Sequence, residues 1–285
     1  MSTLTSTPDR AIPTAFTSPA PAAHRTFAGI MRGEWIKLLS LRSTWWILAS
    51  TAALMTLVSF AAAMSLNVMA DDPVMAPALA EMHGADVISG GSQIAVLTVS
   101  VLGALFITGE YSTGMIRSTF AAVPTRLPVL AAKAIALVVL TTAVTIVGVT
   151  LSYFVTMPQL SEYNLVPALD DPGTWRVLGG TVYFLIAAAL FTLGIGTLLR
   201  STAATVTSAL TVLLLLPGIL SFITLDWVEN FVSYLPLPAS TVFISSSAAE
   251  VPGAGLTPEQ GIITIAAYAV VPMIAATVAL RRRDA

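Results

Sequence analysis

Six long apolar runs, separated by shorter polar segments, dominate the pattern of this chain. A helix needs about 20 apolar residues to cross the hydrocarbon core of a bilayer. The runs that meet this length are 44–66, 87–108, 128–157, 177–199, 202–225 and 261–280. The pattern predicts an all-α membrane protein whose six transmembrane helices lie within residues 44–285.

The polar segment before the first run carries an apolar stripe of its own. In FAGIMRGEWIKLLSLRS, residues 27–43, the apolar positions recur at helical spacing, at Phe27, Ile30, Met31, Trp35, Leu38 and Leu39. This pattern predicts an amphipathic helix in the membrane interface, with its basic side toward lipid phosphates. Glu34 and Lys37 stand at i and i+3, where a pair stabilises a helix by a few tenths of a kcal/mol. Membrane anchoring alone and additional contact with a cytoplasmic partner both remain open, and the candidate residues are Trp35, Glu34, Lys37 and Arg42.

A second stripe lies between the second and third runs, in GEYSTGMIRSTFAAVPTRLP, residues 109–128. Its apolar positions are Met115, Ile116, Phe120 and Val123. Ser112 or Thr113 is expected to cap a short helix, which Pro124 would end, and Pro128 suits the first position of the next helix. The segment therefore predicts a short amphipathic helix between two long ones. Periodicity alone would favour a helix that rests on lipid.

The charges predict an orientation for this bundle. All lysines and arginines except Arg176 fall on one side of the predicted spans, whereas the opposite loops are acidic. Cytoplasmic loops are enriched in Lys and Arg, so both termini are expected in the cytoplasm, with the chain in the cell membrane. The third run is longer than a span requires, so its first turns and Lys133 are expected near the cytoplasmic surface.

Composition agrees with a membrane protein. The chain has 285 residues, of which 56% are hydrophobic and only 10% charged, whereas soluble domains carry roughly 25% charged residues. It has no cysteine, which excludes disulfides and thiolate metal sites. Residues 1–26 are rich in Ser, Thr, Pro and Ala. They are expected to form a disordered cytoplasmic tail rather than a signal peptide.

Several function classes lack the residues that they need. Ion-coupled carriers usually place ionisable groups within their spans, and here no Asp, Glu or His falls well inside one. The HExxH motif of intramembrane metalloproteases is absent. A membrane serine protease would need a buried histidine or lysine as the base for its serine, and the spans offer none. The P-loop G-x-x-x-x-G-K-[ST] is also absent. The chain is therefore not expected to be an enzyme, nor to bind a cofactor or nucleic acid itself.

The segment after the second run resembles a known signature. EYSTGMI, followed by AAVPTRLP and then AK, is similar to the pattern of ABC-2 type permeases, the membrane subunits of ATP-binding-cassette exporters. The matching positions are Glu110, Gly114, Pro124, Arg126 and Lys133. GEWIKLLSLRSTWW, residues 33–46, also resembles the segment before the first span in actinobacterial members. One departure is the last outer loop, 226–260, where YLPLPAS and TVFISSS could form only short dips into the membrane.

The resemblance implies a mechanism. Residues 110–123 would carry the cytoplasmic coupling helix, which docks on a separate ABC-type ATPase that binds ATP and Mg. The candidate contacts are Glu110, Tyr111, Gly114, Met115, Ile116, Arg117, Phe120 and Arg126. Met115, Ile116 and Phe120 would offer the apolar face, and Glu110 and Arg117 the polar contacts. A complete exporter would contain two ATPase copies and a second permease, identical or homologous.

The cargo path is indicated only weakly. In related transporters the second and fifth helices line it, and here they carry Gln93, Ser100, Thr205, Ser208 and Thr211. A mostly apolar lining would suit an amphipathic or lipid-like cargo. The alternative function is a non-transporting scaffold or immunity-type protein that recruits cytoplasmic partners.

Overall fold

The structure is a computed structural model that describes residues 26–80, 82–123, 125–245 and 255–282. Most of the predicted N-terminal tail, and Pro124 with its predicted helix-ending role, therefore lie outside the described residues. All regular secondary structure within those ranges is helical. The helices are α1 Phe27–Ser40, α2 Arg42–Asp71, α3 Ala76–Ala80, α4 Gly84–Ser89, α5 Ser92–Ser112, α6 Met115–Ala122, α7 Leu127–Glu162, α8 Pro172–Leu199, α9 Thr202–Leu210, η1 Thr211–Leu215, α10 Leu216–Leu220, α11 Asp226–Ser233, α12 Pro236–Ile244 and α13 Pro258–Arg282.

Six helical stretches in the described part of the chain are long and apolar enough to cross a membrane, as the hydrophobic pattern predicts. Most extend a few residues beyond the predicted spans, because the polar ends of a helix continue past its apolar centre. The second stretch joins α4 and α5 over Gly84–Ser112, and the fifth ends early, at Leu220. The helical fold class and the six helices of membrane-spanning length and apolarity are thereby confirmed, whereas the topology and the orientation stay predictions.

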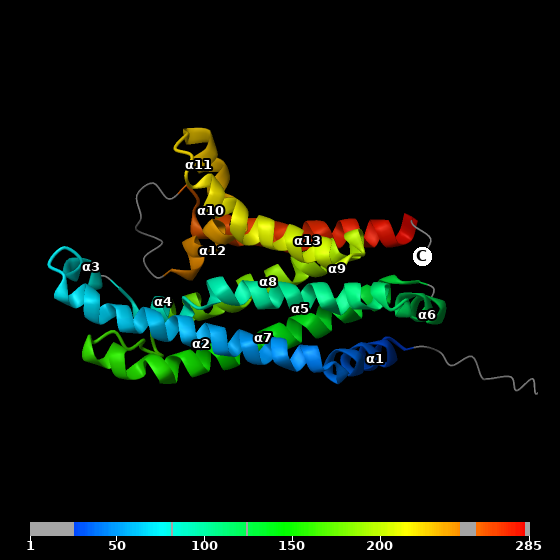
Figure 1. Ribbon diagram of the computed structural model, residues 1–285, viewed down its shortest axis with the longest axis horizontal. Coiled ribbons are helices and arrows are strands. Elements are labelled where there is room, and N and C mark those ends of the chain that lie inside the picture. The colour runs from blue at the N-terminus through cyan, green and yellow to red at the C-terminus, as the bar shows by residue number, and fades with distance from the viewer. Residues whose placement is uncertain (1–25, 81, 124, 246–254, 283–285) are drawn as a thin grey trace, which may run out of the picture.

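The long helices pack as a bundle (Figure 1). α8 contacts α5, α7 and α13, and α2 packs along α5 and α7. Small residues permit this close approach. A Cβ placed on Gly103 of α5 would come within 2.7 Å of the Ala189 carbonyl oxygen of α8, so this crossing requires glycine.

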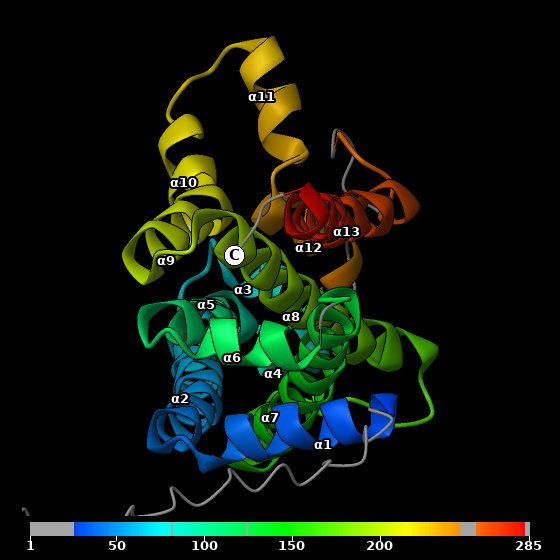
Figure 2. The same ribbon diagram turned by 90° about the vertical axis from the view of Figure 1, so that its right-hand side faces the viewer.

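Two short helices lie at the same end of the bundle. Figure 2, which looks along the bundle, shows that α1 and α6 run across this end rather than along its axis. α3, α4 and the loop from α7 to α8 lie at the opposite end (Figure 1). The segment 27–43 is thus not one continuous helix, because α1 ends at Ser40 and α2 begins at Arg42.

The capping of α6 differs from the prediction. Gly114, with a φ of 72°, precedes the helix, and no side chain caps it. Ser112 and Thr113 instead donate their hydroxyl hydrogens back to the Gly109 carbonyl oxygen of α5. The left-handed backbone at Gly114 turns the chain sharply, which is the conformation that glycine adopts at least cost.

The loop predicted to hold only short dips contains two helices, α11 and α12. α12 covers Pro236–Ile244 and so joins most of the two predicted dips into one element. η1, a turn of π-helix, interrupts the fifth span before α10. In both views α10 and α11 project away from the other helices (Figures 1 and 2).

Candidate functional site

Four charged side chains meet at the end of the bundle that holds α1 and α6. They are Glu34 and Lys37 of α1, Glu110 of α5 and Lys133 of α7, and we call them the charge cluster. The Lys37 Nζ lies 2.7 Å from Glu34 Oε1 and 2.9 Å from Glu110 Oε1. The Lys133 Nζ lies 2.5 Å from Glu34 Oε2 and 2.8 Å from Glu110 Oε1. Each lysine thus bridges both glutamates.

Lys133 is the centre of this cluster. Its side chain is fully buried, at 0% exposure, although it lies at the end of the bundle that is predicted to face the cytoplasm. The ammonium donates to Glu34, to Glu110 and, at 3.4 Å, to the Phe106 carbonyl oxygen. It also lies 4.3 Å from the centroid of the Phe106 ring. All three N–H groups are therefore satisfied, which a buried ammonium requires.

Lys37 connects the cluster to α6. Besides the two glutamates, its Nζ donates to Thr119 Oγ1 at 3.2 Å. This inward orientation corrects the prediction that the basic side of the helix faces lipid phosphates. Partial burial acts to lower the pKa of Lys37, but hydrogen bonds to Glu34 and Glu110 outweigh it and hold the pKa above 10.5. Because the folded-state value is the higher one, this stabilisation is present at neutral pH and is lost only as pH rises above that range.

The cluster is neutral as a unit, and it joins four helices. Two lysines balance two glutamates across α1, α5 and α7, and Thr119 adds α6. Removing one partner from a buried ion pair leaves an uncompensated charge, which costs about 3–5 kcal/mol. The charge cluster thus holds α1 and α6 to the long helices α5 and α7, and breaking any one of its ion pairs would cost considerable free energy.

The apolar side of α6 faces its own protein. Ile116 and Phe120 are buried in the main core, so the prediction that they form an open docking face is wrong. The exposed residues of α6 are Met115, Arg117, Ser118 and Ala121. Any partner at this helix would meet these side chains.

Two arginines tie the neighbourhood of α6 to other helices. Arg126 precedes α7 with a φ of 54°, donates to the Leu280 carbonyl oxygen of α13 and lies over the Phe120 ring. Arg200, at the end of α8, lies over the ring of Tyr111, its Cζ 5.4 Å from the centroid. Arg126, which is predicted as a contact for the ATPase, is therefore held by contacts within its own protein.

A groove of about 540 Å³ separates α1 from α6. Gly29 and Gly33 line the α1 side, and Met115 and Ser118 line the α6 side. Glu34 and Lys37 also line it, so the groove leads from the protein surface to the charge cluster. Trp35 is partly buried against the core, whereas Arg42 is exposed outside the groove.

The candidate cargo residues are only partly brought together. α5, which carries Gln93 and Ser100, packs against α9, which carries Thr205 and Ser208. Ser100 is buried, and its hydroxyl has no hydrogen-bond partner among the described residues. Thr205 is also buried but donates to the Ser201 carbonyl oxygen, whereas Gln93 lines a small cavity beside α12. Ser208 and Thr211 are half-buried on α9 and η1.

Comparison with known proteins leaves the family open, since no family model matches the chain and no curated protein matches it. The case for a function therefore rests on the geometry of the cluster and of α6.

Proposed function

We propose that this chain is the permease subunit of an ATP-driven exporter of the ABC-2 type, and that α6 receives the movement of a separate ATPase. The observation that carries the proposal is the charge cluster. It links α6 through Lys37 to Glu110 of α5 and Lys133 of α7. Glu110 and Lys133 are also residues on which the resemblance to this family rests.

The contacts of α6 would allow a movement at the protein surface to be transmitted to the long helices. α6 is short, is packed against the core by Ile116 and Phe120 and is bonded to α1 through Thr119 and Lys37. A force on its exposed face therefore moves α1, α5 and α7 together, because packed interiors shift between discrete arrangements rather than deform continuously. Coupling helices require this property.

The ATPase would dock on the exposed face of α6 and on the adjacent groove. The groove has an ion pair along its wall, Glu34 with Lys37, and apolar side chains from both helices. Such a mixed surface suits a protein partner whose contacting segment carries both apolar and charged residues. A second permease copy would complete the membrane path for an amphipathic or lipid-like cargo.

Co-purification tests the proposal. We expect an ABC-type ATPase encoded beside this chain to co-purify with it, and ATP hydrolysis to require that subunit. Arg117→Glu on the exposed face of α6 is expected to weaken the complex. Arg282→Glu, at another exposed arginine, at the end of α13, is the matched control and should leave it intact. Failure of any such ATPase to bind would favour the scaffold alternative.

A further inference from the structure

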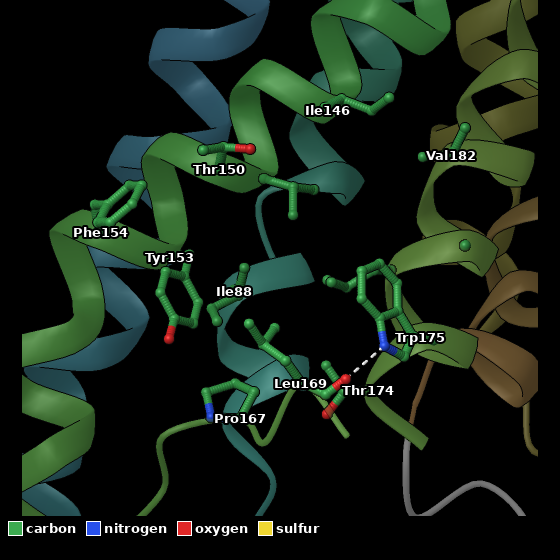
Figure 3. A pocket seen from close by; sticks show the side chains of 13 residues that line it. Ile88, Ile146, Thr150, Tyr153, Phe154, Pro167, Leu169, Thr174, Trp175 and Val182 are labelled. Atoms are coloured by element: carbon green, nitrogen blue, oxygen red, sulfur yellow. Dashed lines mark hydrogen bonds between the residues drawn. The ribbon is translucent and has the colours of Figure 1, made fainter. Parts of the chain in front are cut away.

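An apolar groove of about 520 Å³ lies at the opposite end of the bundle, between α7 and α8 (Figure 3). Tyr153 and Phe154 of α7 stand on one side, and Trp175 and Val182 of α8 on the other. Ile88 of α4 lies between the two helices. The groove shares no residue with the charge cluster or with the groove beside α6.

The groove opens sideways, toward the membrane. Ile146, Phe154 and Trp175 line it and are each more than half exposed. These residues belong to two stretches that are long and apolar enough to span a bilayer. In a bilayer, lipid would lie against this opening, and apolar hollows hold apolar molecules rather than water.

The loop between α7 and α8 borders one end of the groove. It contributes Pro167 and Leu169 there, and the Trp175 indole N–H donates to the Leu169 carbonyl oxygen at 2.8 Å. Tyr153 and Thr150 also line the groove (Figure 3), and neither hydroxyl forms a hydrogen bond within the described part of the chain. Both can donate to an ester carbonyl oxygen.

The length of the groove matches one leaflet. The distance from Phe154 to Ile146 along α7 is about 12 Å at the helical rise of about 1.5 Å per residue. Half of a bilayer core is about 15 Å thick. An extended acyl chain that begins at the level of Tyr153 would therefore run past Thr150 to Ile146 and Val182.

From these observations we propose that the groove is a binding site for one acyl chain of a membrane phospholipid. The ester region lies at Tyr153 and Trp175, and the chain lies between α7 and α8. This site is independent of the proposed transport function. It belongs to the leaflet at the α3 and α4 end of the bundle, and its phospholipid is a resident component rather than the cargo.

Gly179 permits a sharp test, because it forms part of the wall and a Cβ placed there would meet no atom within 4 Å. Gly179→Leu thus adds a side chain at the wall of the groove with open space at its Cβ, and leucine is also the better helix former. Gly218→Leu on α10 is the matched control, since its Cβ position is equally open and lies outside the groove. A double variant, Thr150→Val with Tyr153→Phe, removes only the two hydroxyls.

The measurement is native mass spectrometry of protein purified in detergent and then incubated with dioleoyl phosphatidylglycerol. We expect one phospholipid to remain on the wild type and on Gly218→Leu, and none on Gly179→Leu. The double variant should retain at least about threefold less, since the loss of even one hydrogen bond lowers affinity by about that factor. Equal retention by all variants, or a wild type that carries detergent only, would overturn the assignment.

Discussion

Lys133 interrupts an otherwise apolar run, VLAAKAIALVVL, and the structure places it where its charge is matched. Its pairing with Glu110 spans 23 residues of sequence, and its pairing with Glu34 spans 99. Lone ionisable residues within a span are usually paired or functional, so the sequence does contain a signal that this lysine has a partner. It does not say which partner, because helix periodicity orders only residues within one helix.

Substitution of Lys133 tests the cluster. Lys133→Met leaves two glutamates with one lysine, and we expect it to destabilise the protein by about 3–5 kcal/mol. The double variant Lys133→Met with Glu110→Gln keeps the neutral pair of Glu34 and Lys37, and should recover much of that loss. Thermal unfolding in detergent measures both. A Lys133→Met variant as stable as the wild type would contradict a cluster that holds the helices together.

Among the shorter elements, the sequence predicts α6 as a helix, but it does not predict that the apolar face of this helix packs against the protein's own core. The stripe of Ile116 and Phe120 indicated an apolar face, yet periodicity does not tell whether such a face meets lipid, a partner or the protein's own core. The chain reversal at Gly114 decides the outcome, because it folds α6 back across the end of the bundle. This turn also explains why Ser112 and Thr113 do not cap the helix.

A pair of glycine variants tests the turn before α6. Gly114→Ala must hold a side chain at a φ of 72°, which costs roughly 1–2 kcal/mol. Gly109→Ala is the control, since a Cβ there meets nothing within 4 Å and alanine in a helix gains about 0.5–1 kcal/mol over glycine. Chemical denaturation should show a loss for the first variant and none for the second. Equal stabilities would mean that the turn is not held as described.

At the scale of the whole molecule, the spans were the most predictable feature, because length and hydropathy alone define them. Their break at Gly90 and Gly91, the π-helix η1 and the projecting helices α10 and α11 were not foreseen. These irregular features depend on packing between distant segments. A Cβ on Gly91, for example, would come within 2.2 Å of the Met55 carbonyl oxygen of α2.

The predicted orientation can be measured by cysteine labelling, since the chain has no cysteine of its own. Ser118→Cys on α6 should be protected from an impermeant thiol reagent in intact cells. Val74→Cys and Ala168→Cys, at the opposite end of the bundle, should react. The reverse pattern would place α6 outside the cell and exclude contact with a cytoplasmic ATPase.

Site-specific photo-crosslinking at α6 tests the central claim most directly. A photoreactive amino acid at Arg117 or Ser118, both exposed, is expected to form a covalent adduct with the co-expressed ATPase in cells. The same group at Val74 or Leu169, exposed at the other end of the bundle, is expected to form none. If the ATPase co-purifies but yields no adduct at either α6 position, α6 is not the element that receives its movement.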